Sequence, residues 1–368
     1  MNYSLKNKIE KMSRECGYIM KILYAVSPIG LGHAARSVAI ALELEKLGYE
    51  ITFASDNKVC RFLREYGFPC IVVHDKVPYF SISKEGKLRR ITFWMINYVR
   101  FYKRMKKKAD KFVRNWNTVI SDEEFAFGVK ALEYGRKLVF ISDLIETHFS
   151  RNRFSKWIEE KTNQWFLEFY KKVPLLIAVE ETSLSLPNIK EIYPIVRKTY
   201  KDREEIRNEI NADSFDKVIL ITSGGGAAGN FIYKFAMKAL SELDLHDVLV
   251  VIVGSKKRDK NTRFPTRYYE FYRDLHELVY ASDLVITTAG KTTIDECLVY
   301  GTPFIAIPIK DHYEQERNAI KYGFKYEDLL RLNELIPGKL YGNKPTKINN
   351  RLDIAVKEIN SFLIDQNI

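Results

Sequence analysis

Two glycine turns in the second half of the chain have the composition of phosphate-binding sites. The first, Ser223-Gly224-Gly225-Gly226, lies between an apolar run and a helical pattern. The second contains Gly290 and leads into Lys291, Thr292 and Thr293 at the start of another helical pattern. Backbone N–H groups in such turns and the positive end of the following helix favour an anion. We therefore expect these two turns to hold the phosphates of a ligand.

Polar residues after the second turn are suited to bind the remainder of a nucleotide sugar. Glu296 lies three positions after Thr293 on one helical face, and its carboxylate suits the two O–H donors of a ribose diol. The alternative is a capping box formed by Thr293 and Glu296. A polar set also follows the apolar run 304–307, and it is suited either to sugar hydroxyls or to a solvated helix start. Its candidate sugar-binding residues are Asp311, Glu314 and Gln315.

The first half contains a third turn, in which Gly30, Gly32 and Ala35 fit the spacing G-x-G-x-x-A after a strand and before a helix. Asp56 lies about 24 residues beyond Gly32, just after the next predicted strand. This context also fits the fingerprint of a dinucleotide-binding site. An NAD- or FAD-dependent enzyme is therefore an alternative interpretation of this turn, which we otherwise assign to the donor site.

His33 stands in the same turn and is a candidate general base. The positive end of a helix disfavours the protonated ring, so we expect a neutral imidazole that accepts a proton. In the common doubly wound strand order, the strand that ends before Asp122 neighbours the first strand, which places Asp122 on the same rim. Asp122 would then orient His33. The alternatives are that His33 packs in the turn and that Asp122 caps the next helix.

These residues require parallel sheets whose carboxyl ends meet at a cleft. Apolar runs alternate with helical patterns through both halves of the chain, which predicts two doubly wound α/β domains with the ligand between them. The predicted strands are 21–26, 50–54, 70–74, 118–121, 137–141, 175–179, 217–222, 248–253, 284–287 and 304–307. The predicted helices include 34–47, 59–66, 231–243, 272–281, 292–300 and 350–363.

The motifs, in this order, resemble those of GT-B glycosyltransferases. The similarity is strongest to the group that contains the N-acetylglucosaminyltransferase of peptidoglycan synthesis and the plant galactolipid synthases, in glycosyltransferase family 28. The matching residues are Gly30-Leu31-Gly32-His33, Ser223-Gly224-Gly225-Gly226, Ala289-Gly290, Thr293, Glu296, Gly301, Pro303, Asp311, Gln315 and Asn318-Ala319. The resemblance extends over nearly the whole chain from Met20 and implies a GT-B fold with two Rossmann-like domains.

The resemblance implies inverting transfer of a sugar from a UDP-sugar to a hydroxyl acceptor, with no metal and no further cofactor. Gly290 and its neighbours would hold the diphosphate, Glu296 the ribose, and Glu314 and Gln315 the sugar hydroxyls. The peptidoglycan enzyme has two adjacent glutamines where this chain has Glu314-Gln315, so the resemblance does not indicate which sugar is transferred. UDP-N-acetylglucosamine 2-epimerases share the fold and are the enzymatic alternative. A protein that binds a nucleotide sugar without catalysis is the non-enzymatic alternative.

A basic and aromatic segment, residues 87–116, favours an anionic partner. Its interleaved cationic and apolar residues suit an anionic membrane surface and hence a lipid-linked acceptor. A helix with a solvated cationic face is the alternative, and nucleic acid is not expected because it would not explain the glycine turns. The formal net charge is +12, which heat adaptation would also explain.

Composition predicts a globular protein in the cytoplasm, with peripheral attachment to the inner face of the membrane as an option. The hydrophobic fraction is 46%, and no apolar run approaches the ~20 residues of a membrane-spanning helix. Cys60 and Cys70 are a candidate disulfide that we do not expect in that compartment. We expect a polar extension over 1–19, an acceptor domain over 20–190, a linker over 191–215, a nucleotide-sugar domain over 216–349 and a C-terminal helix over 350–368.

Overall fold

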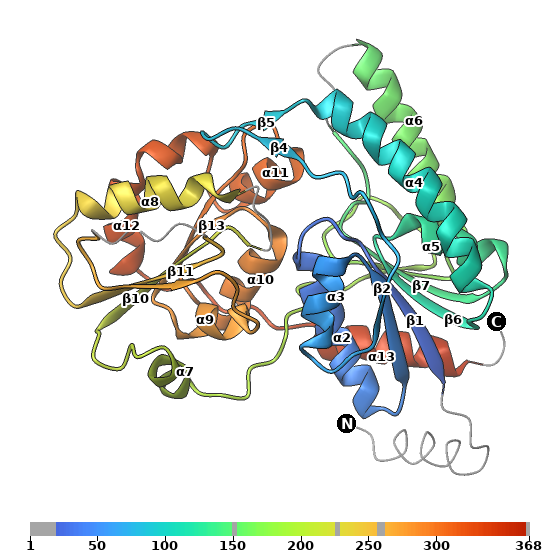
Figure 1. Ribbon diagram of the computed structural model, residues 1–368, viewed down its shortest axis with the longest axis horizontal. Helices are drawn as coiled ribbons and strands as arrows, with labels where there is room; N and C mark the ends of the chain where they lie inside the picture. The colour runs from blue at the N-terminus through green and yellow to red at the C-terminus, as the bar shows by residue number, and fades with distance from the viewer. Residues whose placement is uncertain (1–19, 149–152, 225–228, 256–261, 366–368) are drawn as a thin grey trace.

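A computed structural model describes residues 20–148, 153–224, 229–255 and 262–365, which form two parallel sheets with helices on their faces (Figure 1). The larger sheet has seven strands in the order β3-β2-β1-β6-β7-β8-β9. Its strands are β1 (Lys21–Val26), β2 (Glu50–Ser55), β3 (Cys70–Val72), β6 (Thr118–Asp122), β7 (Lys137–Ser142), β8 (Leu175–Ala178) and β9 (Ile189–Glu191). The pairing of β1 with β6 confirms the predicted neighbours.

The helices of the first half cover both faces of this sheet. Alternate residues of β1 point to opposite sides, with Tyr24 in the core under α2, α3 and α13 and Leu23 in the core under α4, α5 and α6. Both side chains are completely buried. These helices are α2 (Gly32–Lys46), α3 (Asn57–Arg64), α4 (Ile91–Val113), α5 (Phe125–Glu133), α6 (Arg153–Tyr170) and α13 (Leu352–Ile364).

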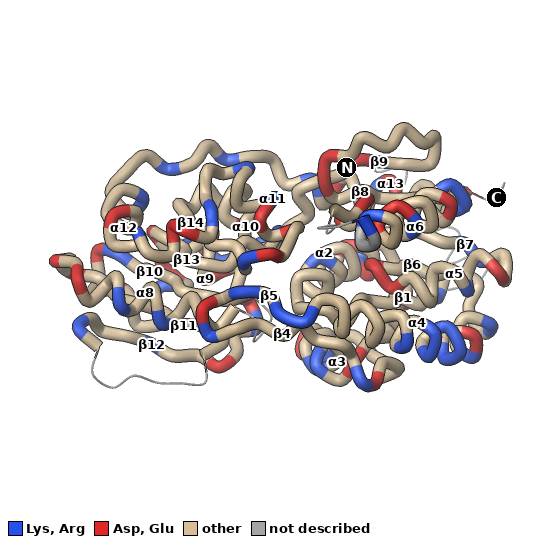
Figure 2. Tube along the Cα trace, turned by 90° about the horizontal axis from the view of Figure 1, so that it is seen from above, with Lys and Arg blue, Asp and Glu red and all other residues tan. Residues whose placement is uncertain are grey.

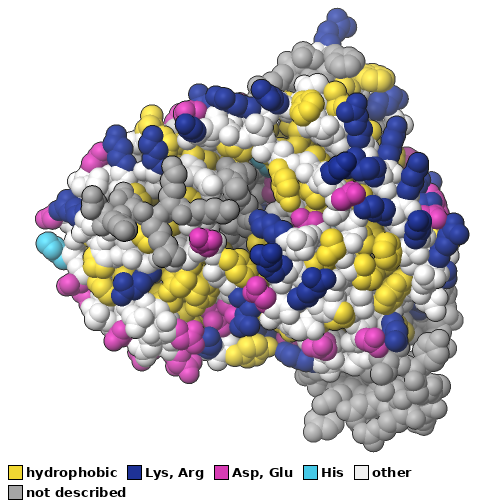
Figure 3. Space-filling view, viewed as in Figure 1, with side chains coloured by type: hydrophobic (Ala, Val, Ile, Leu, Met, Phe, Trp, Pro, Cys, Tyr) yellow, Lys and Arg dark blue, Asp and Glu magenta, His cyan; other side chains and the backbone are white. Residues whose placement is uncertain are grey.

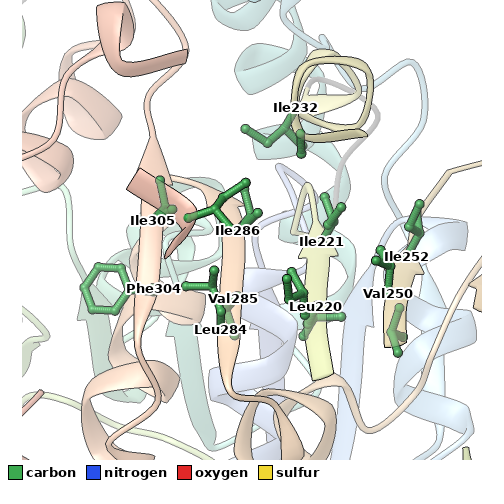
Figure 4. Packing of buried hydrophobic residues seen from close by; sticks show 14 of the residues in the cluster. Leu220, Ile221, Ile232, Val250, Ile252, Leu284, Val285, Ile286, Phe304 and Ile305 are labelled. Atoms are coloured by element: carbon green, nitrogen blue, oxygen red, sulfur yellow. The ribbon is translucent and has the colours of Figure 1, made fainter. Parts of the chain in front are cut away.

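The second sheet has five parallel strands in the order β12-β11-β10-β13-β14. They are β10 (Lys217–Thr222), β11 (Val248–Val253), β12 (Thr266–Tyr269), β13 (Leu284–Thr288) and β14 (Phe304–Ile307). Figure 4 shows Leu220, Ile221, Ile286 and Ile305 packed side by side in its core. Its helices are α7 (Arg203–Glu209), α8 (Phe231–Ser241), α9 (Leu275–Ala281), α10 (Lys291–Tyr300), α11 (Tyr313–Lys321), α12 (Leu332–Leu340) and the 3-10 helix η2 (Tyr326–Leu330).

Two segments connect the halves in addition to the chain that runs from β9 to α7. The helix α13 returns from the second half to the core of the first, where Tyr49 donates a hydrogen bond to Asn360 (2.7 Å). The short hairpin β4 (Ser81–Ile82) and β5 (Leu88–Arg89) reaches in the opposite direction, as Figure 1 shows. Its Leu88 N–H donates to the carbonyl of Lys310, and the N–H of Lys310 donates to Gly86 (both 2.9 Å).

Several features depart from or extend the sequence-based expectations. The sulfurs of Cys60 and Cys70 are bonded, so the disulfide that we did not expect is present. The predicted linker 191–215 contains α7, whose Ile206 is buried in the core of the second sheet. The domain boundaries, and the extension 1–19 that lies outside the described residues, stay predictions. No helix in the described ranges combines the length and hydropathy needed to cross a membrane.

Candidate active site

The turn after β1 carries His33 to the carboxyl edge of the larger sheet, next to Asp122 at the end of β6. The strand register pairs Val26 with Asp122, and α2 begins at Gly32 immediately after the turn. His33 Nδ1 lies 2.9 Å from Asp122 Oδ1. The predicted placement of the two side chains on one rim is therefore confirmed. The other ring nitrogen, Nε2, remains directed away from Asp122 and is the one available for a substrate.

Arg36, which the sequence analysis missed, holds Asp122 in place. Its Nε donates to Asp122 Oδ2 (2.9 Å), its Nη2 lies against Oδ1, and Ser37 donates to Oδ2 (3.1 Å). Burial raises the pKa of Asp122, but Arg36 and His33 outweigh burial and hold that pKa below its usual value. Asp122 is completely buried and has both oxygens occupied. It can therefore orient His33, but it offers nothing to a substrate.

Glu123 is the second residue that the sequence analysis missed. Its backbone is left-handed, with a φ of 51°, and its Oε1 accepts hydrogen bonds from Ser142 Oγ (2.9 Å) and from the N–H groups of Asp143 (2.7 Å) and Leu144 (2.9 Å). Its Oε2 lies 3.7 Å from His33 Nε2. Three donors thus fix this carboxylate so that its second oxygen faces the available side of the imidazole.

The charges around His33 favour its protonated form, contrary to the expected neutral ring. Burial lowers the pKa of His33, but the carboxylates of Glu123, Asp122 and Asp143 outweigh burial and raise that pKa to about 9. The positive end of α2 is a smaller influence than three nearby carboxylates. With this pKa the ring is mostly an imidazolium at neutral pH, and it must lose its proton before it can act as a base.

His33, Glu123 and Asp143 also have the composition of a metal site, because one ligand atom from each lies within 4.8 Å of the others. Arg36 Nη1 already donates to Asp143 Oδ2 (3.0 Å), and Glu123 Oε1 accepts three hydrogen bonds. A cation at this position would face that guanidinium at close range. The expectation of a metal-independent site stays a prediction.

The two halves place their glycine turns opposite each other. A Cβ built on Gly32 would lie 2.8 Å from Thr292 Oγ1, so the start of α2 closely approaches the start of α10. Gly290 precedes α10, and no side chain caps that helix end. The start of α10 is therefore suited to an anion, as predicted. Lys291, which was predicted to assist, pairs with Asp295 (2.7 Å).

The turn after β10 is only partly described. Gly225 and Gly226, two of the predicted donor-binding residues, lie outside the described residues. Ser223 lies at the end of the strand, where its hydroxyl accepts a hydrogen bond from Tyr233 (2.9 Å). Gly224 has a φ of 67°, which glycine adopts without strain. Thr288 donates to the carbonyl of Ser223 (3.3 Å), which joins this turn to the one after β13.

Glu296 does not form the alternative capping box, because α10 begins after Gly290 and Thr293 lies inside the helix. Its side chain is buried beside Arg197, whose Nη2 lies 3.4 Å from Glu296 Oε1. Burial raises the pKa of Glu296, and Arg197 opposes that rise. The other arm of Arg197 donates to Tyr66 of the first half. A ribose that binds Glu296 must therefore share the carboxylate with Arg197 or displace it.

The predicted sugar-binding residues lie at the start of α11. Gln315 Oε1 accepts a hydrogen bond from the N–H of Ile309 (3.0 Å), and the N–H of Asp311 donates to Glu316 (2.8 Å). Glu314 lies in the first turn of the helix. Gln315 thus has a structural bond that sequence alone did not indicate.

The same helix contacts the first half through an ion pair that the sequence analysis also missed. Arg317 of α11 donates to Glu180, which follows β8. Asn318, one position further along, donates to the carbonyl of Ala289 (3.2 Å). The predicted sugar-binding segment is therefore tied both to the first half and to the turn before α10.

The acidic residue that the dinucleotide interpretation requires, Asp56, is engaged in other hydrogen bonds in the structure. Asp56 Oδ1 accepts from the N–H of Val59 (2.8 Å) and caps α3, and Oδ2 accepts from Tyr79 (3.2 Å). A ribose 2′-hydroxyl would have to compete with both bonds. The first glycine turn is thus better explained by its position opposite α10 than by a dinucleotide fingerprint.

Comparison with known proteins finds a family model that matches part of the second half. Residues 218–340 match the glycosyltransferase family 28 C-terminal domain. An uncharacterized glycosyltransferase of Methanopyrus kandleri is 32% identical over 118 residues, which are 32% of this chain and 33% of that protein. A UDP-N-acetylglucosamine–N-acetylmuramyl-(pentapeptide) pyrophosphoryl-undecaprenol N-acetylglucosamine transferase of Bacillus cereus is 24% identical, over 89% of this chain and 92% of that protein.

A solved structure supports the arrangement of both halves. The glycotransferase of kitacinnamycin superposes with a TM-score of 0.62 at 13% identity, over 94% of this chain and 99% of that one. The two parallel α/β sheets thus follow the GT-B architecture that the sequence analysis predicted. At this identity the likeness concerns the fold alone.

Proposed function

We propose that this chain, a GT-B glycosyltransferase with a family 28 C-terminal domain, transfers a sugar from a UDP-sugar to a hydroxyl acceptor without a metal and with inversion. The single observation that carries the proposal is the approach of Gly32 to Thr292 across the cleft. It brings a turn suited to diphosphate next to the His33–Asp122 pair. The transferase of Bacillus cereus takes UDP-N-acetylglucosamine by its name, which supports UDP as the leaving group.

The transfer requires one proton to be removed and one leaving group to be stabilised. The acceptor O–H gives its proton to Nε2 of a neutral His33, and the acceptor oxygen bonds to C1 of the sugar. The bond from C1 to the diphosphate oxygen breaks, and UDP takes its electron pair. The N–H groups at the start of α10 stabilise the added negative charge, and Lys291 joins them if it leaves Asp295.

Glu123 influences the proton that His33 must lose before it can act as a base, because its carboxylate faces Nε2. Its Oε2 lies 3.7 Å from His33 Nε2, so an acceptor hydroxyl could contact both atoms from one side but could not lie between them. Burial and Asp143 raise the pKa of Glu123, and His33 and Arg36 oppose that rise. The pKa values of Glu123 and His33 therefore depend on each other, and a change at either residue alters the protonation of the other.

A lipid-linked acceptor is supported by the outer surface of α4 and α6. Phe93, Ile96 and Val99 on α4 are about half exposed or more (61%, 49% and 51%), as is Trp157 on α6 (56%). Figure 2 shows Lys and Arg repeated along α4, and Figure 3 shows cationic side chains spread over the same part of the molecule. Such a surface suits an anionic membrane. Part of its charge is paired internally, for example Lys106 with Glu133.

The proposal is tested first by ligand-induced thermal shifts with UDP, GDP, CMP and their sugars. We expect UDP to raise the unfolding midpoint, because a ligand at one hundred times its Kd adds about 2.7 kcal/mol to stability. A second assay incubates UDP-sugar without acceptor, where only slow hydrolysis is expected. Conversion of the UDP-sugar to an isomer in that assay would instead show an epimerase. A shift with NAD and none with any nucleotide sugar would remove the proposal.

A further inference from the structure

The hairpin formed by β4 and β5 belongs to the first half in sequence, but its apolar side chains pack on the second half (Figure 1). Ile82 and Leu88 are paired in the hairpin, and both lie against the core of the second sheet. Each strand contributes only two residues. A hairpin of two strands is at best marginally stable on its own in water. The hairpin therefore depends on the second half for its order.

Main-chain hydrogen bonds attach the tip of the hairpin to the chain that follows β14. The N–H of Lys310 donates to the carbonyl of Gly86, and the carbonyl of Lys310 accepts from the N–H of Leu88 (both 2.9 Å). Tyr326 of η2 donates its hydroxyl to the carbonyl of Glu85 (2.5 Å). These bonds hold the main chain of the tip against the second half, whatever the side chains of the tip are.

Gly86 is the tightest point of this contact. Its φ of 82° is left-handed, a conformation that glycine adopts without strain. A Cβ built on Gly86 would lie 2.7 Å from Cγ and Cδ2 of Phe231. Phe231 begins α8 and is buried in the core of the second sheet, with 5% of its surface exposed. Glycine is therefore the residue that allows the tip of the hairpin to rest on this ring.

Lys310, to which the tip is bonded, precedes the predicted sugar-binding residues. Asp311 follows it with a φ of 70°, a left-handed conformation that a non-glycine residue adopts only at a cost in energy. On the other side of Asp311, the ring of His312 meets the ring of Phe80 of the first half, with centroids 5.1 Å apart. Both neighbours of Asp311 therefore contact the first half, which restricts the conformation of this turn.

The predicted contacts of the donor divide between two parts of the second half. The phosphates are assigned to the turns before α8 and α10, and the ribose to Glu296. The sugar is assigned to residues 311–315, which directly follow Lys310. A disturbance of the bonds between the hairpin and Lys310 should therefore affect the sugar more than it affects UDP.

We propose that Gly86 is a positioning residue for the donor sugar. It seats the hairpin on Phe231, and the hairpin then holds Lys310 so that Asp311 and the segment after it keep the orientation that a sugar requires. The inference rests on the proposed glycosyl transfer and deepens it. It assigns to the half that carries His33 a part in binding the sugar of the donor, which Gly86 plays through Lys310 without touching the substrate.

The test is calorimetric titration of the full natural chain and of Gly86→Ala with UDP and with UDP-N-acetylglucosamine, UDP-glucose and UDP-galactose. The comparison uses the UDP-sugar that the natural chain binds most tightly. We expect Gly86→Ala to weaken that UDP-sugar about fivefold or more, which corresponds to the loss of about one hydrogen bond, and to weaken UDP less than about twofold.

Gly48→Ala is the matched control for the glycine replacement. Gly48 also has a positive φ, of 92°, but nothing lies within 4 Å of its added Cβ. The control therefore introduces the same kind of backbone strain without pressing on the second half. We expect it to leave the affinities for UDP and for the UDP-sugar unchanged.

Tyr326→Phe keeps the proposal testable if Gly86→Ala disturbs folding. It removes the hydroxyl that binds Glu85 and keeps the ring that lies 5.1 Å from the Lys310 ammonium. We expect it to weaken the same UDP-sugar about twofold to fivefold and to leave UDP unchanged. Tyr341→Phe is its control, because Tyr341 is an exposed tyrosine of the second half whose ring faces Lys217, and it should change neither affinity.

The outcomes separate the positioning role from the proposed transfer. Equal losses for UDP and the UDP-sugar in Gly86→Ala would mean that the hairpin acts through α8 and its phosphate turn. Unchanged affinities in both Gly86→Ala and Tyr326→Phe would mean that the hairpin has no part in donor binding. Either result would overturn the positioning role alone, whereas absence of UDP binding in the natural chain would contradict the proposed transfer and this inference with it.

Discussion

The imidazole of His33 is surrounded by more negative charge than a general base near neutral pH would have. Asp122 fixes its Nδ1 side, and Glu123 faces Nε2. With a pKa of about 9, the ring is mostly protonated at pH 7. The proposed transfer should therefore become faster as pH rises toward 9, because only the neutral ring can take the acceptor proton.

The protonation of His33 can be measured without any acceptor. We expect the ring protons of His33 to titrate near pH 9 by NMR, and Glu123→Gln to lower that pKa because it removes the nearest carboxylate on the Nε2 side. The raised pKa of His33 stabilises the folded protein. This contribution to stability is fully present below the unfolded pKa of about 6.5 and is lost as pH rises through about 9.

Glu124→Gln is the matched control for this titration. It removes a carboxylate one position away that pairs with His74 and has no contact with His33, so the His33 titration should stay in place. An unchanged His33 pKa in Glu123→Gln would mean that the surrounding carboxylates do not set its charge.

Glu296 is the second residue whose role can be measured directly. Glu296→Ala should weaken UDP by about tenfold or more, because a hydrogen bond to a charged group contributes about 1.5–3 kcal/mol. Glu296→Gln keeps the size of the side chain and should weaken UDP binding less than Glu296→Ala does. Unaltered UDP affinity in Glu296→Ala, measured by calorimetry, would show that the carboxylate only pairs with Arg197.

Sequence could identify His33 and Asp122 but not the residues that control them. Strand order alone placed that pair on one rim, since parallel strands end at the same edge. Arg36 lies one helical turn after His33, which was an available signal, but its bonds to Asp122 and Asp143 depend on strands distant in sequence. No sequence pattern around Glu123 predicts the left-handed backbone that directs its side chain.

The starts of α2 and α10 form the contact on which the proposed donor site depends. Gly32→Ala would place a methyl group 2.8 Å from Thr292 Oγ1. We expect a loss of about 1–3 kcal/mol of stability, the usual cost of overpacking, together with weaker UDP binding. Unfolding midpoints in denaturant and UDP titrations measure the two effects.

Thr292→Ala provides the partner for a double-mutant cycle. Without Oγ1 the nearest remaining atom of residue 292 would be its Cβ, at 3.6 Å, so Thr292→Ala should recover much of the stability lost in Gly32→Ala. Gly290→Ala is the control for glycine replacement, because nothing lies within 4 Å of its added Cβ. Additive losses in the cycle would mean that the two helix starts do not press on each other.

At the level of elements, the sequence patterns located the buried strands and the edge strands β3 and β14 but missed the edge strands β9 and β12. Runs such as 217–222 and 248–253 are apolar on both faces and were predicted with their observed bounds. The strands β9 and β12 lie at sheet edges and are only partly buried, so their residues Ile189–Glu191 and Thr266–Tyr269 show no such run. The two-residue strands of the hairpin are too short for any periodicity.

Across the whole molecule, Glu180 and Arg317 join the first sheet to the helix that carries the predicted sugar-binding residues. Burial raises the pKa of Glu180 to about 7, although Arg317 and Lys291 oppose that rise and Asp143 adds to it. The folded protein therefore holds this proton more tightly than the unfolded chain does. Protonation of Glu180 therefore stabilises the folded protein. This stabilisation is fully present below about pH 4.5 and declines as pH rises through about 7.

This decline predicts a difference between the natural chain and Glu180→Gln. Thermal unfolding midpoints of the natural chain should fall relative to those of the variant between about pH 4.5 and 7, because only the natural chain loses the proton. Glu181→Gln, at the neighbouring exposed position, is the control and should follow the natural chain. Parallel curves for Glu180→Gln and the natural chain would show that Glu180 does not titrate in this range.

The return of α13 to the first sheet has a consequence for how the protein is made. Leu352, Ile359 and Leu363 fill the core beside α2, and Tyr49 bonds Asn360, yet this helix follows the whole second sheet in the chain and is translated after it. Domains usually fold during synthesis, starting from the N-terminus. Here the N-terminal domain must wait, with an apolar groove open, while the entire C-terminal domain is translated. Translation that stops before residue 352 would release a chain whose second domain is complete and whose first is not.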